Sequence, residues 1–249
     1  EMASTPQLLQ ERLNASADYR RLFAEAFPDQ QQQGVTLDQL YLSLAAFQTS
    51  LISLNSPYDR YAQGSPDALT PKELEGFNIY RSFVARCSEC HTPPLFTNQQ
   101  VAAIGVNEPD GRPFDPGAEV PSHNPDWHGA FKVPSLRNIA RTAPYMHSGT
   151  FDNLRDAAEF YTKGRGHELP EEEKAKVHIH WHIWEPKLTD AELDRLVDFM
   201  QALTDESFTP AIPERVPSGL KPIGRLPAAL HDSAKSATTT LSITEPTGE

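Results

Sequence analysis

Apolar residues recur with helical spacing in three stretches of the chain, and a capping box precedes each stretch. The boxes begin at Thr36, Thr70 and Thr189. In such a box the Thr hydroxyl accepts a hydrogen bond from a first-turn backbone N–H, and the Gln or Glu three residues later reaches back. Each box therefore predicts a helix start, and Pro71 suits the first helical position. The apolar positions behind the boxes are Leu37, Leu40, Tyr41, Leu44, Phe47 and Leu51; then Leu74, Phe77, Tyr80 and Phe83; and last Leu193, Leu196, Val197, Met200 and Leu203.

The remaining segments complete a mostly α-helical picture with long irregular loops and little β-structure. Further helices are predicted over residues 6–27 and 153–161. Residues 92–132 are rich in Pro, Asn, Asp and Gly, which predicts a long ordered loop of the kind that serves function or surrounds a cofactor. Residues 178–184 alternate His with apolar residues, which predicts a strand with three imidazoles on one side. The three Glu residues at positions 171–173 predict the solvated first turn of a helix.

Composition narrows the class of protein. The chain has 249 residues, a net charge of −12, 38% hydrophobic residues and 22 Pro. The acidic balance argues against a nucleic-acid partner, because phosphates would find no neutralising charge. No stretch approaches the roughly 20 apolar residues that span a bilayer. The first residues carry neither the charged nor the apolar region of a signal peptide, so we expect a mature form or a fragment.

Both Cys residues lie in one motif, Cys87-Ser88-Glu89-Cys90-His91. Two thiols on one helical turn can add to the vinyl groups of a haem, and the adjacent imidazole then reaches the iron; this spacing is typical of c-type haem attachment. A thioredoxin-like pair would need a βαβ context, and a structural zinc would need four ligands. The motif therefore predicts one covalent haem c, with His91 as an axial ligand of the iron. Its maturation implies export from the cytoplasm.

The second axial ligand stays open on spacing alone. The candidates are the three Met residues, the remaining His residues and Tyr161; the Met residues are Met2, Met146 and Met200. The identity of this ligand decides the chemistry of the haem.

Several longer segments resemble a known family, the bacterial di-haem cytochrome c peroxidases and MauG-type enzymes, and in particular their C-terminal haem domain. The segments are residues 131–138 (FKVPSLRN) and 142–149 (TAPYMHSG), with residues 50–61, 188–203 and 213–220 also similar. The resemblance covers most of residues 5–225. It implies a cytochrome c-like haem domain over residues 1–225, followed by a Pro-, Ser- and Thr-rich tail over residues 226–249.

The resemblance also implies roles for individual residues. Where the peroxidases carry a Met ligand, this chain has Tyr161, and MauG-type enzymes carry a Tyr ligand there. The resemblance thus implies Tyr161 opposite His91, with His147 near a haem propionate. It further implies calcium held in part by the backbone carbonyls of Thr142 and Pro144, since calcium prefers oxygen ligands.

Two departures from the family pattern bear on function. Family members carry two CxxCH motifs, and this chain has one, so a second haem domain or chain is the expected partner. The chain is then a fragment, a split subunit or a mono-haem variant. MauG carries a Trp two residues before the first haem Cys, where this chain has Ala85. Trp127, Trp181 and Trp184 are alternative carriers of oxidising equivalents, or they serve packing.

The sequence therefore predicts the haem domain of a MauG-like periplasmic oxidoreductase. Such an enzyme uses peroxide to oxidise a protein partner by long-range electron transfer, and Tyr161 ligates the electron-relaying haem. Three alternatives remain. One is the electron-donating domain of an ordinary di-haem cytochrome c peroxidase, and another is a mono-haem electron-transfer cytochrome, for which a Met or His ligand is expected. The third is a non-enzymatic binding or maturation-accessory module, for which a buried and redox-silent haem is expected.

Overall fold

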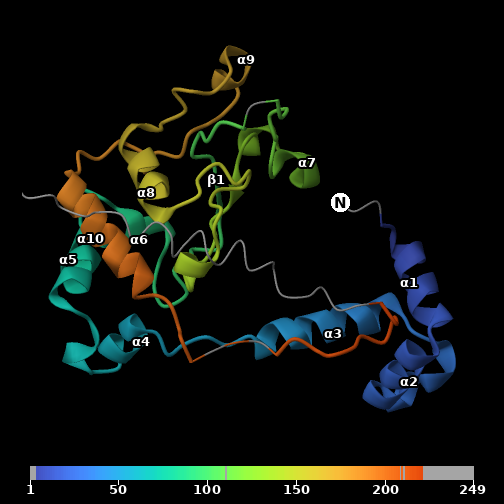
Figure 1. Ribbon diagram of the computed structural model, residues 1–249. Coiled ribbons are helices and arrows are strands. Elements are labelled where there is room, and N and C mark those ends of the chain that lie inside the picture. The colour runs from blue at the N-terminus through green and yellow to red at the C-terminus, as the bar shows by residue number, and fades with distance from the viewer. Residues whose placement is uncertain (1–3, 110, 208, 210, 221–249) are drawn as a thin grey trace, which may run out of the picture. The chain divides into compact units, whose positions relative to one another are not determined.

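The computed structural model describes residues 4–109, 111–207, 209 and 211–220, without the side chains of residues 31–33. They fall into two compact units, Glu1–Ile52 with Thr209–Glu249, and Ser53–Phe208. The two units are drawn together in Figure 1. The predicted boundary between residues 225 and 226 lies outside the described residues and stays a prediction.

The first unit is helical. It contains α1 (Pro6–Ala15), α2 (Ala17–Ala26), the 3₁₀ helix η1 (Pro28–Gln33) and α3 (Leu37–Ser50). The prediction of a single helix over residues 6–27 was wrong, because Ser16 has an extended backbone and its hydroxyl accepts from the Tyr19 N–H as the cap of α2. Such local side-chain bonds compete with helix continuation. The box at Thr36 is confirmed, with both hydrogen bonds to Gln39 present.

The second unit holds the haem motif. Its helices are α4 (Pro57–Ala62), η2 (Pro66–Ala68), α5 (Pro71–Tyr80), α6 (Cys87–Cys90), α7 (Glu119–Ser122), η3 (Pro125–Trp127), η4 (Ile139–Arg141), α8 (Leu154–Lys163), α9 (Glu171–Lys174) and α10 (Asp190–Gln201). Strands β1 (Val101–Ala102) and β2 (Phe131–Lys132) pair antiparallel, with Val101 opposite Lys132. The mostly α-helical class with little β-structure is confirmed. The boxes at Thr70 and Thr189 are confirmed as well.

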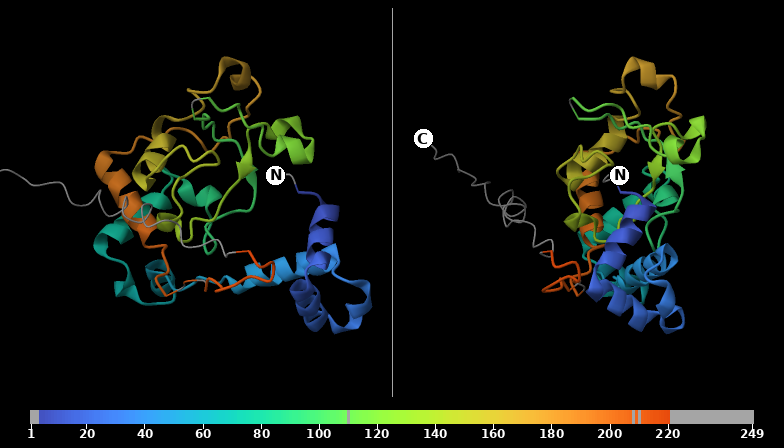
Figure 2. Two further views of the ribbon diagram at one scale, coloured as in Figure 1. Left: turned by 45° about the vertical axis from the view of Figure 1, so that its right-hand side comes forward. Right: turned by 90° about the vertical axis from the view of Figure 1, so that its right-hand side faces the viewer.

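The core of the second unit lies where α10 packs against α5 and α8 (Figure 2). Its main cluster contains the fully buried rings of Tyr80, Phe96 and Phe199, whose centroids lie 4.9–6.2 Å apart. Gly76 permits the close crossing of α5 and α10, because a Cβ there would lie 1.9 Å from the Arg195 carbonyl oxygen. The crossing thus fixes the end of α5, from which the chain runs into the haem motif.

Three local predictions needed correction. The helix from Thr70 ends at Tyr80 and does not include Phe83. Residues 178–184 form no strand, since only Ile179 makes an isolated bridge, with Ala103. Only two of the three imidazoles lie together: His180 stacks on His182 with ring centroids 5.2 Å apart, whereas His178 lies 3.8 Å from Asp126.

The Glu-rich segment is also less solvated than predicted. It does begin a short helix, α9, but the side chain of Glu173 is only 14% exposed. Its carboxylate accepts from His128 at 2.6 Å and from Lys176 at 3.1 Å. Glu173, which the sequence predicted to be solvated, therefore helps to hold α9 against the loop that carries His128.

Candidate haem site

The haem motif occupies a single helical turn after a sharp change of direction. Arg86 has a left-handed backbone with φ 55°, and α6 then runs from Cys87 to Cys90. The His91 N–H donates to the Cys87 carbonyl at 2.9 Å, which closes the turn. Both Cys residues are free thiols. The turn therefore presents two unpaired sulfur atoms and the imidazole together, as the spacing predicted.

Two backbone carbonyls fix the ring of His91. Its Nδ1 lies 3.2 Å from the Phe96 oxygen and 3.0 Å from the Pro134 oxygen. Because both partners are acceptors, Nδ1 carries the proton, and Nε2 keeps its lone pair. Burial lowers the pKa of His91, which favours the neutral imidazole that metals require. Hydrogen bonds from Nδ1–H to carbonyls are typical of metal-ligating His residues.

The backbone of His91 is held from the other side by Tyr80. The Tyr80 hydroxyl donates to the His91 carbonyl oxygen, and the Tyr80 side chain at the end of α5 is only 1% exposed. Burial, with a smaller influence of the Cys87 thiol, raises the pKa of Tyr80. Tyr80 is therefore a neutral donor that connects the aromatic core to the haem motif.

Tyr161 lies on α8, whose N-terminus is capped by the Asn153 side chain. Burial raises the pKa of Tyr161, and the Cys87 and Cys90 thiols raise it further. Burial also raises the pKa of Cys87 to about 12, so its resting form is the neutral thiol. Cys87 of the haem turn and Ala158 of α8 both pack against the aromatic core cluster, so α8 and the haem turn border the same core.

The donor set matches the needs of a covalent haem. Among the hydrogen bonds of the described residues, none engages the Tyr161 hydroxyl or Nε2 of His91. The Cys87 thiol has only a long contact, 3.7 Å to the Ala85 oxygen. Two thiols can attach haem c, and an imidazole nitrogen and a phenol oxygen are both known ligands of haem iron. The residues present therefore fit this cofactor; Cys87 and Cys90 stay the predicted attachment sites, and His91 and Tyr161 the predicted iron ligands.

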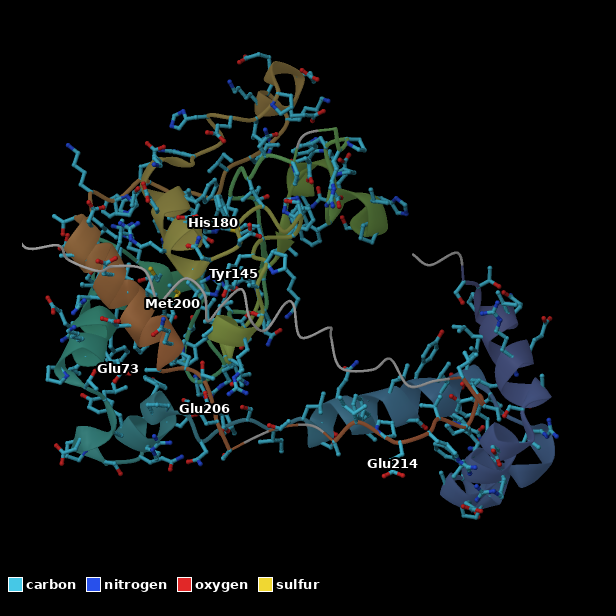
Figure 3. All side chains as sticks on the ribbon, viewed as in Figure 1. Glu73, Tyr145, His180, Met200, Glu206 and Glu214 are labelled. Atoms are coloured by element: carbon cyan, nitrogen blue, oxygen red, sulfur yellow. The ribbon has the colours of Figure 1, made fainter. Side chains whose placement is uncertain are left out.

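Some of the other candidates for the second axial position have contacts elsewhere, whereas Nδ1 of His182 is buried without a hydrogen-bond partner among the described residues. Met146 and Met200 pack against the apolar cluster around Tyr145, and Met200 and Tyr145 are labelled in Figure 3. His147 Nε2 lies 2.6 Å from Glu108, and its ring stacks on Phe131 with centroids 3.8 Å apart. Met2 lies outside the described residues. Tyr161 as the second axial ligand and the propionate role of His147 both stay predictions.

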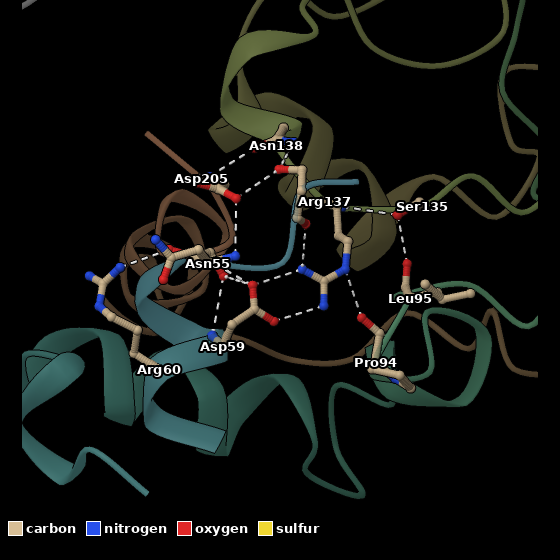
Figure 4. Close-up of polar contacts among 11 residues, drawn as sticks. Asn55, Asp59, Arg60, Pro94, Leu95, Ser135, Arg137, Asn138 and Asp205 are labelled. Atoms are coloured by element: carbon tan, nitrogen blue, oxygen red, sulfur yellow. Dashed lines mark hydrogen bonds and ion pairs between the residues drawn. The ribbon is translucent and has the colours of Figure 1, made fainter. Parts of the chain in front are cut away.

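Arg137 and Asp59 form a buried ion pair (Figure 4) that the sequence did not predict. Arg137 appeared only inside the family-like segment 131–138, and nothing in its spacing to the haem motif points to a shared site. Its partners Asp59 and Pro94 lie 78 and 43 positions away. A buried cation next to a haem motif becomes visible only when the chain is folded.

Trp184 and Trp181 differ in their contacts with the segment before the haem motif. Trp184 donates from Nε1 to the Val84 carbonyl at 3.0 Å, directly before the haem turn. The guanidinium of Arg86 lies 4.0 Å from the centre of the Trp184 ring and 3.9 Å from that of Phe83. Trp181 is 67% exposed and contacts the ring of His182. Trp184 is therefore fixed against the segment that precedes Cys87.

Apart from the haem iron, the side chains offer little support for a bound metal ion. Within the described part of the chain, no group of three or more His, Cys, Asp or Glu residues could hold a metal ion. Thr142 and Pro144 lie in an exposed segment after η4. A calcium site there rests on their backbone carbonyls and stays a prediction.

Comparison with known proteins shows what the chain as a whole is similar to. The family model for di-haem cytochrome c peroxidase matches residues 1–67. The MauG of Methylophilus methylotrophus is 30% identical over 208 residues, which are 82% of this chain and 58% of that protein. The cytochrome c551 peroxidase of Nitrosomonas europaea is 32% identical over 167 residues, 66% of this chain and 48% of that protein.

Solved structures give the same result. A MauG-like protein associated with microbial copper homeostasis has a TM-score of 0.67 and 31% identity, over 83% of this chain and 65% of that one. The di-haem peroxidase BthA of Burkholderia thailandensis shares the fold, with a TM-score of 0.62 and 24% identity over 88% of this chain and 63% of that one. Over most of its length the chain is therefore similar to the di-haem cytochrome c peroxidases and MauG proteins. It spans about half to three fifths of the length of the two curated relatives.

One further finding concerns membranes. No helix among the described residues is long and apolar enough to cross a bilayer.

Proposed function

We propose that Cys87 and Cys90 attach one haem c and that His91 and Tyr161 ligate its iron. One observation carries this proposal. The Nδ1–H of His91 is bound by two backbone carbonyls, which leaves Nε2 of the imidazole available to a metal. The assignment of Tyr161 as the opposite ligand rests on the family resemblance. A haem with imidazole and phenolate ligands favours Fe(III) over Fe(II), because the phenolate is a hard anionic donor.

The whole protein is proposed to be a MauG-like di-haem oxidoreductase. It uses peroxide to oxidise a protein partner by long-range electron transfer, and a second haem domain or chain meets the peroxide. The similarity to cytochrome c peroxidases and MauG supports this. The proposal includes a periplasmic location and a calcium ion bound in part by the carbonyls of Thr142 and Pro144.

The roles of this chain's own residues follow from their contacts. His91 keeps a fixed tautomer and ring orientation through the Phe96 and Pro134 carbonyls. Tyr161 must lose its proton to bind iron, and its burial makes that loss unfavourable without a metal. Trp184 is a poor carrier of oxidising equivalents, because the Arg86 cation over its ring opposes a positive charge there.

The first experiment measures the haem content of the purified protein by intact mass, then its absorption spectrum before and after adding hydrogen peroxide. Two haems, with a long-lived oxidised species after peroxide, support the full proposal. A single haem that ignores peroxide even when the second haem domain is supplied sinks the enzymatic part. That result would favour a mono-haem electron-transfer cytochrome.

The second experiment tests the ligand. Tyr161→Phe removes the phenol oxygen, so the ferric spectrum should change its axial-ligand bands and the midpoint potential should rise. The matched control is Tyr145→Phe. Tyr145 is a buried tyrosine of the same unit, 8% exposed, whose hydroxyl donates to the Ile139 carbonyl at 3.0 Å. An unchanged spectrum in Tyr161→Phe rules Tyr161 out as a ligand.

A further inference from the structure

Arg137 and Asp59 form a bidentate ion pair inside the second unit (Figure 4). The guanidinium donates to the two carboxylate oxygens at 2.8 and 2.9 Å, and the two side chains are only 10% and 8% exposed. Asp59 also accepts from the backbone N–H and the hydroxyl of Ser56, at 2.9 and 2.7 Å. Each charge therefore has a partner and a fixed place, which a buried pair requires.

Arg137 uses its remaining donors on backbone carbonyls. Its Nε donates to the Pro94 oxygen at 2.9 Å, and its Nη1 to the Ser53 oxygen at 3.2 Å. Its backbone N–H donates to the Ser135 hydroxyl, which donates to the Leu95 oxygen at 2.6 Å. Arg137 thus joins the segment 94–96 to the segment 134–137 at two points.

These two segments carry the carbonyls that hold His91. The Phe96 oxygen belongs to the first segment and the Pro134 oxygen to the second, and the Leu136 N–H also donates to the Phe96 oxygen at 3.3 Å. Phe96 has 0% exposure, and the Arg137 guanidinium lies 5.7 Å from its ring centre. The separation of the two acceptors around Nδ1 therefore depends on the connections that Arg137 makes.

We infer that Arg137, held in place by Asp59, is a positioning residue for the axial histidine. By fixing the Phe96 and Pro134 carbonyls against the Nδ1–H of His91, it sets the orientation and the donor strength of the imidazole. A hydrogen bond from Nδ1–H makes the imidazole a more basic ligand, and a more basic ligand favours Fe(III). This inference rests on the proposed ligation of the haem by His91.

A purely structural role is the competing explanation, because any buried ion pair affects stability. The two roles predict different measurements. A structural pair changes the unfolding midpoint alone, whereas a positioning pair also changes the haem potential and the orientation of the imidazole plane. The ferric electron paramagnetic resonance spectrum is sensitive to that orientation.

The test compares the haem-loaded wild type with Arg137→Lys. The ammonium keeps the charge but cannot form the fork that reaches Asp59 and Pro94 together. We expect the ratio of Fe(III) to Fe(II) to fall by roughly tenfold at a fixed potential, which is a rise in midpoint potential of about 59 mV for one electron. We also expect shifted ferric g-values.

The matched control is Asp205→Asn. Asp205 is a 3% exposed carboxylate in the same polar network, and it accepts from Ser53 and Asn55 without touching residues 94–96 or 134–136. It should lower stability and leave the potential and g-values unchanged. If Arg137→Lys fails to fold, Asp59→Asn is the second variant, and its midpoint potential should shift in the same direction.

The outcomes separate the inference from the proposed function. Unchanged potential and g-values in a folded Arg137→Lys or Asp59→Asn overturn the positioning role, as does an equal shift in Asp205→Asn. The wild-type spectrum tests the function by itself. If it lacks a histidine ligand, the proposed ligation fails before any variant is compared.

Discussion

Gly76→Ala tests whether the crossing of α5 and α10 is as close as the structure indicates. The added Cβ would lie 1.9 Å from the carbonyl oxygen of Arg195 and 2.9 Å from Cβ of Phe199, against about 3.4 Å for an ordinary contact. A backbone carbonyl in a helix cannot rotate away. The two helices must therefore separate by roughly 1.5 Å, which loosens the packing of Phe199 on Phe77 and Tyr80.

The magnitude follows from two opposing effects. Alanine is favoured over glycine inside a helix by about 1 kcal/mol. Overpacking a core costs about 1–3 kcal/mol and occasionally more, and the clash with backbone places this site at the upper end. We expect a net loss of about 2–3 kcal/mol, which lowers the melting temperature by roughly 4–12 °C for a domain of this size.

Thermal unfolding of the haem-loaded protein, followed by circular dichroism, measures the change. Glu75→Ala is the control, because this exposed neighbour on α5 changes helix propensity without touching α10 and should stay within about 0.5 kcal/mol. If Gly76→Ala melts at or above the wild-type temperature, the close crossing of the two helices is wrong.

Two further predictions concern the hydrogen bonds of Tyr80 and His128. Tyr80→Phe leaves the His91 carbonyl without its donor and should lower the free energy of unfolding by about 1–3 kcal/mol in a urea titration; an unchanged titration midpoint contradicts the role given to Tyr80. Burial lowers the pKa of His128, but hydrogen bonds to the carboxylates of Glu119 and Glu173 outweigh it and raise the pKa. Because the folded pKa is raised, this contribution to stability is complete below about pH 6.5 and is lost as pH rises through the folded pKa. His128→Gln should abolish that dependence in melting curves across pH, and an unaltered pH profile refutes the assignment.

Local signals in the sequence predicted the local structure well. The capping boxes at Thr36, Thr70 and Thr189 form as predicted, because their hydrogen bonds join residues three positions apart. The haem turn also depends on five consecutive residues. The same local logic failed at Ser16, where helical apolar spacing continues across a residue that caps a second helix.

Patterns that need a distant partner were less informative. The alternation over residues 178–184 predicted a strand, but a strand exists only where another segment offers a free edge. Here Ala103 provides a single bridge to Ile179, and the chain then turns away. Gly76 is a similar case. A carbonyl on another helix leaves no room for a side chain there, so the sequence of α5 alone does not indicate why this residue is glycine.

The sequence by itself determined the helical class, the helix starts and the one turn that presents Cys87, Cys90 and His91, because all of these depend on neighbours within a few residues. Only the tertiary structure decided which nitrogen of His91 is free, since its Nδ1 partner Pro134 lies 43 positions away. It also brought Arg137 onto Asp59. The physical reason is that burial, tautomer and ligand orientation are set by groups that are distant in the sequence and meet only when the chain is folded.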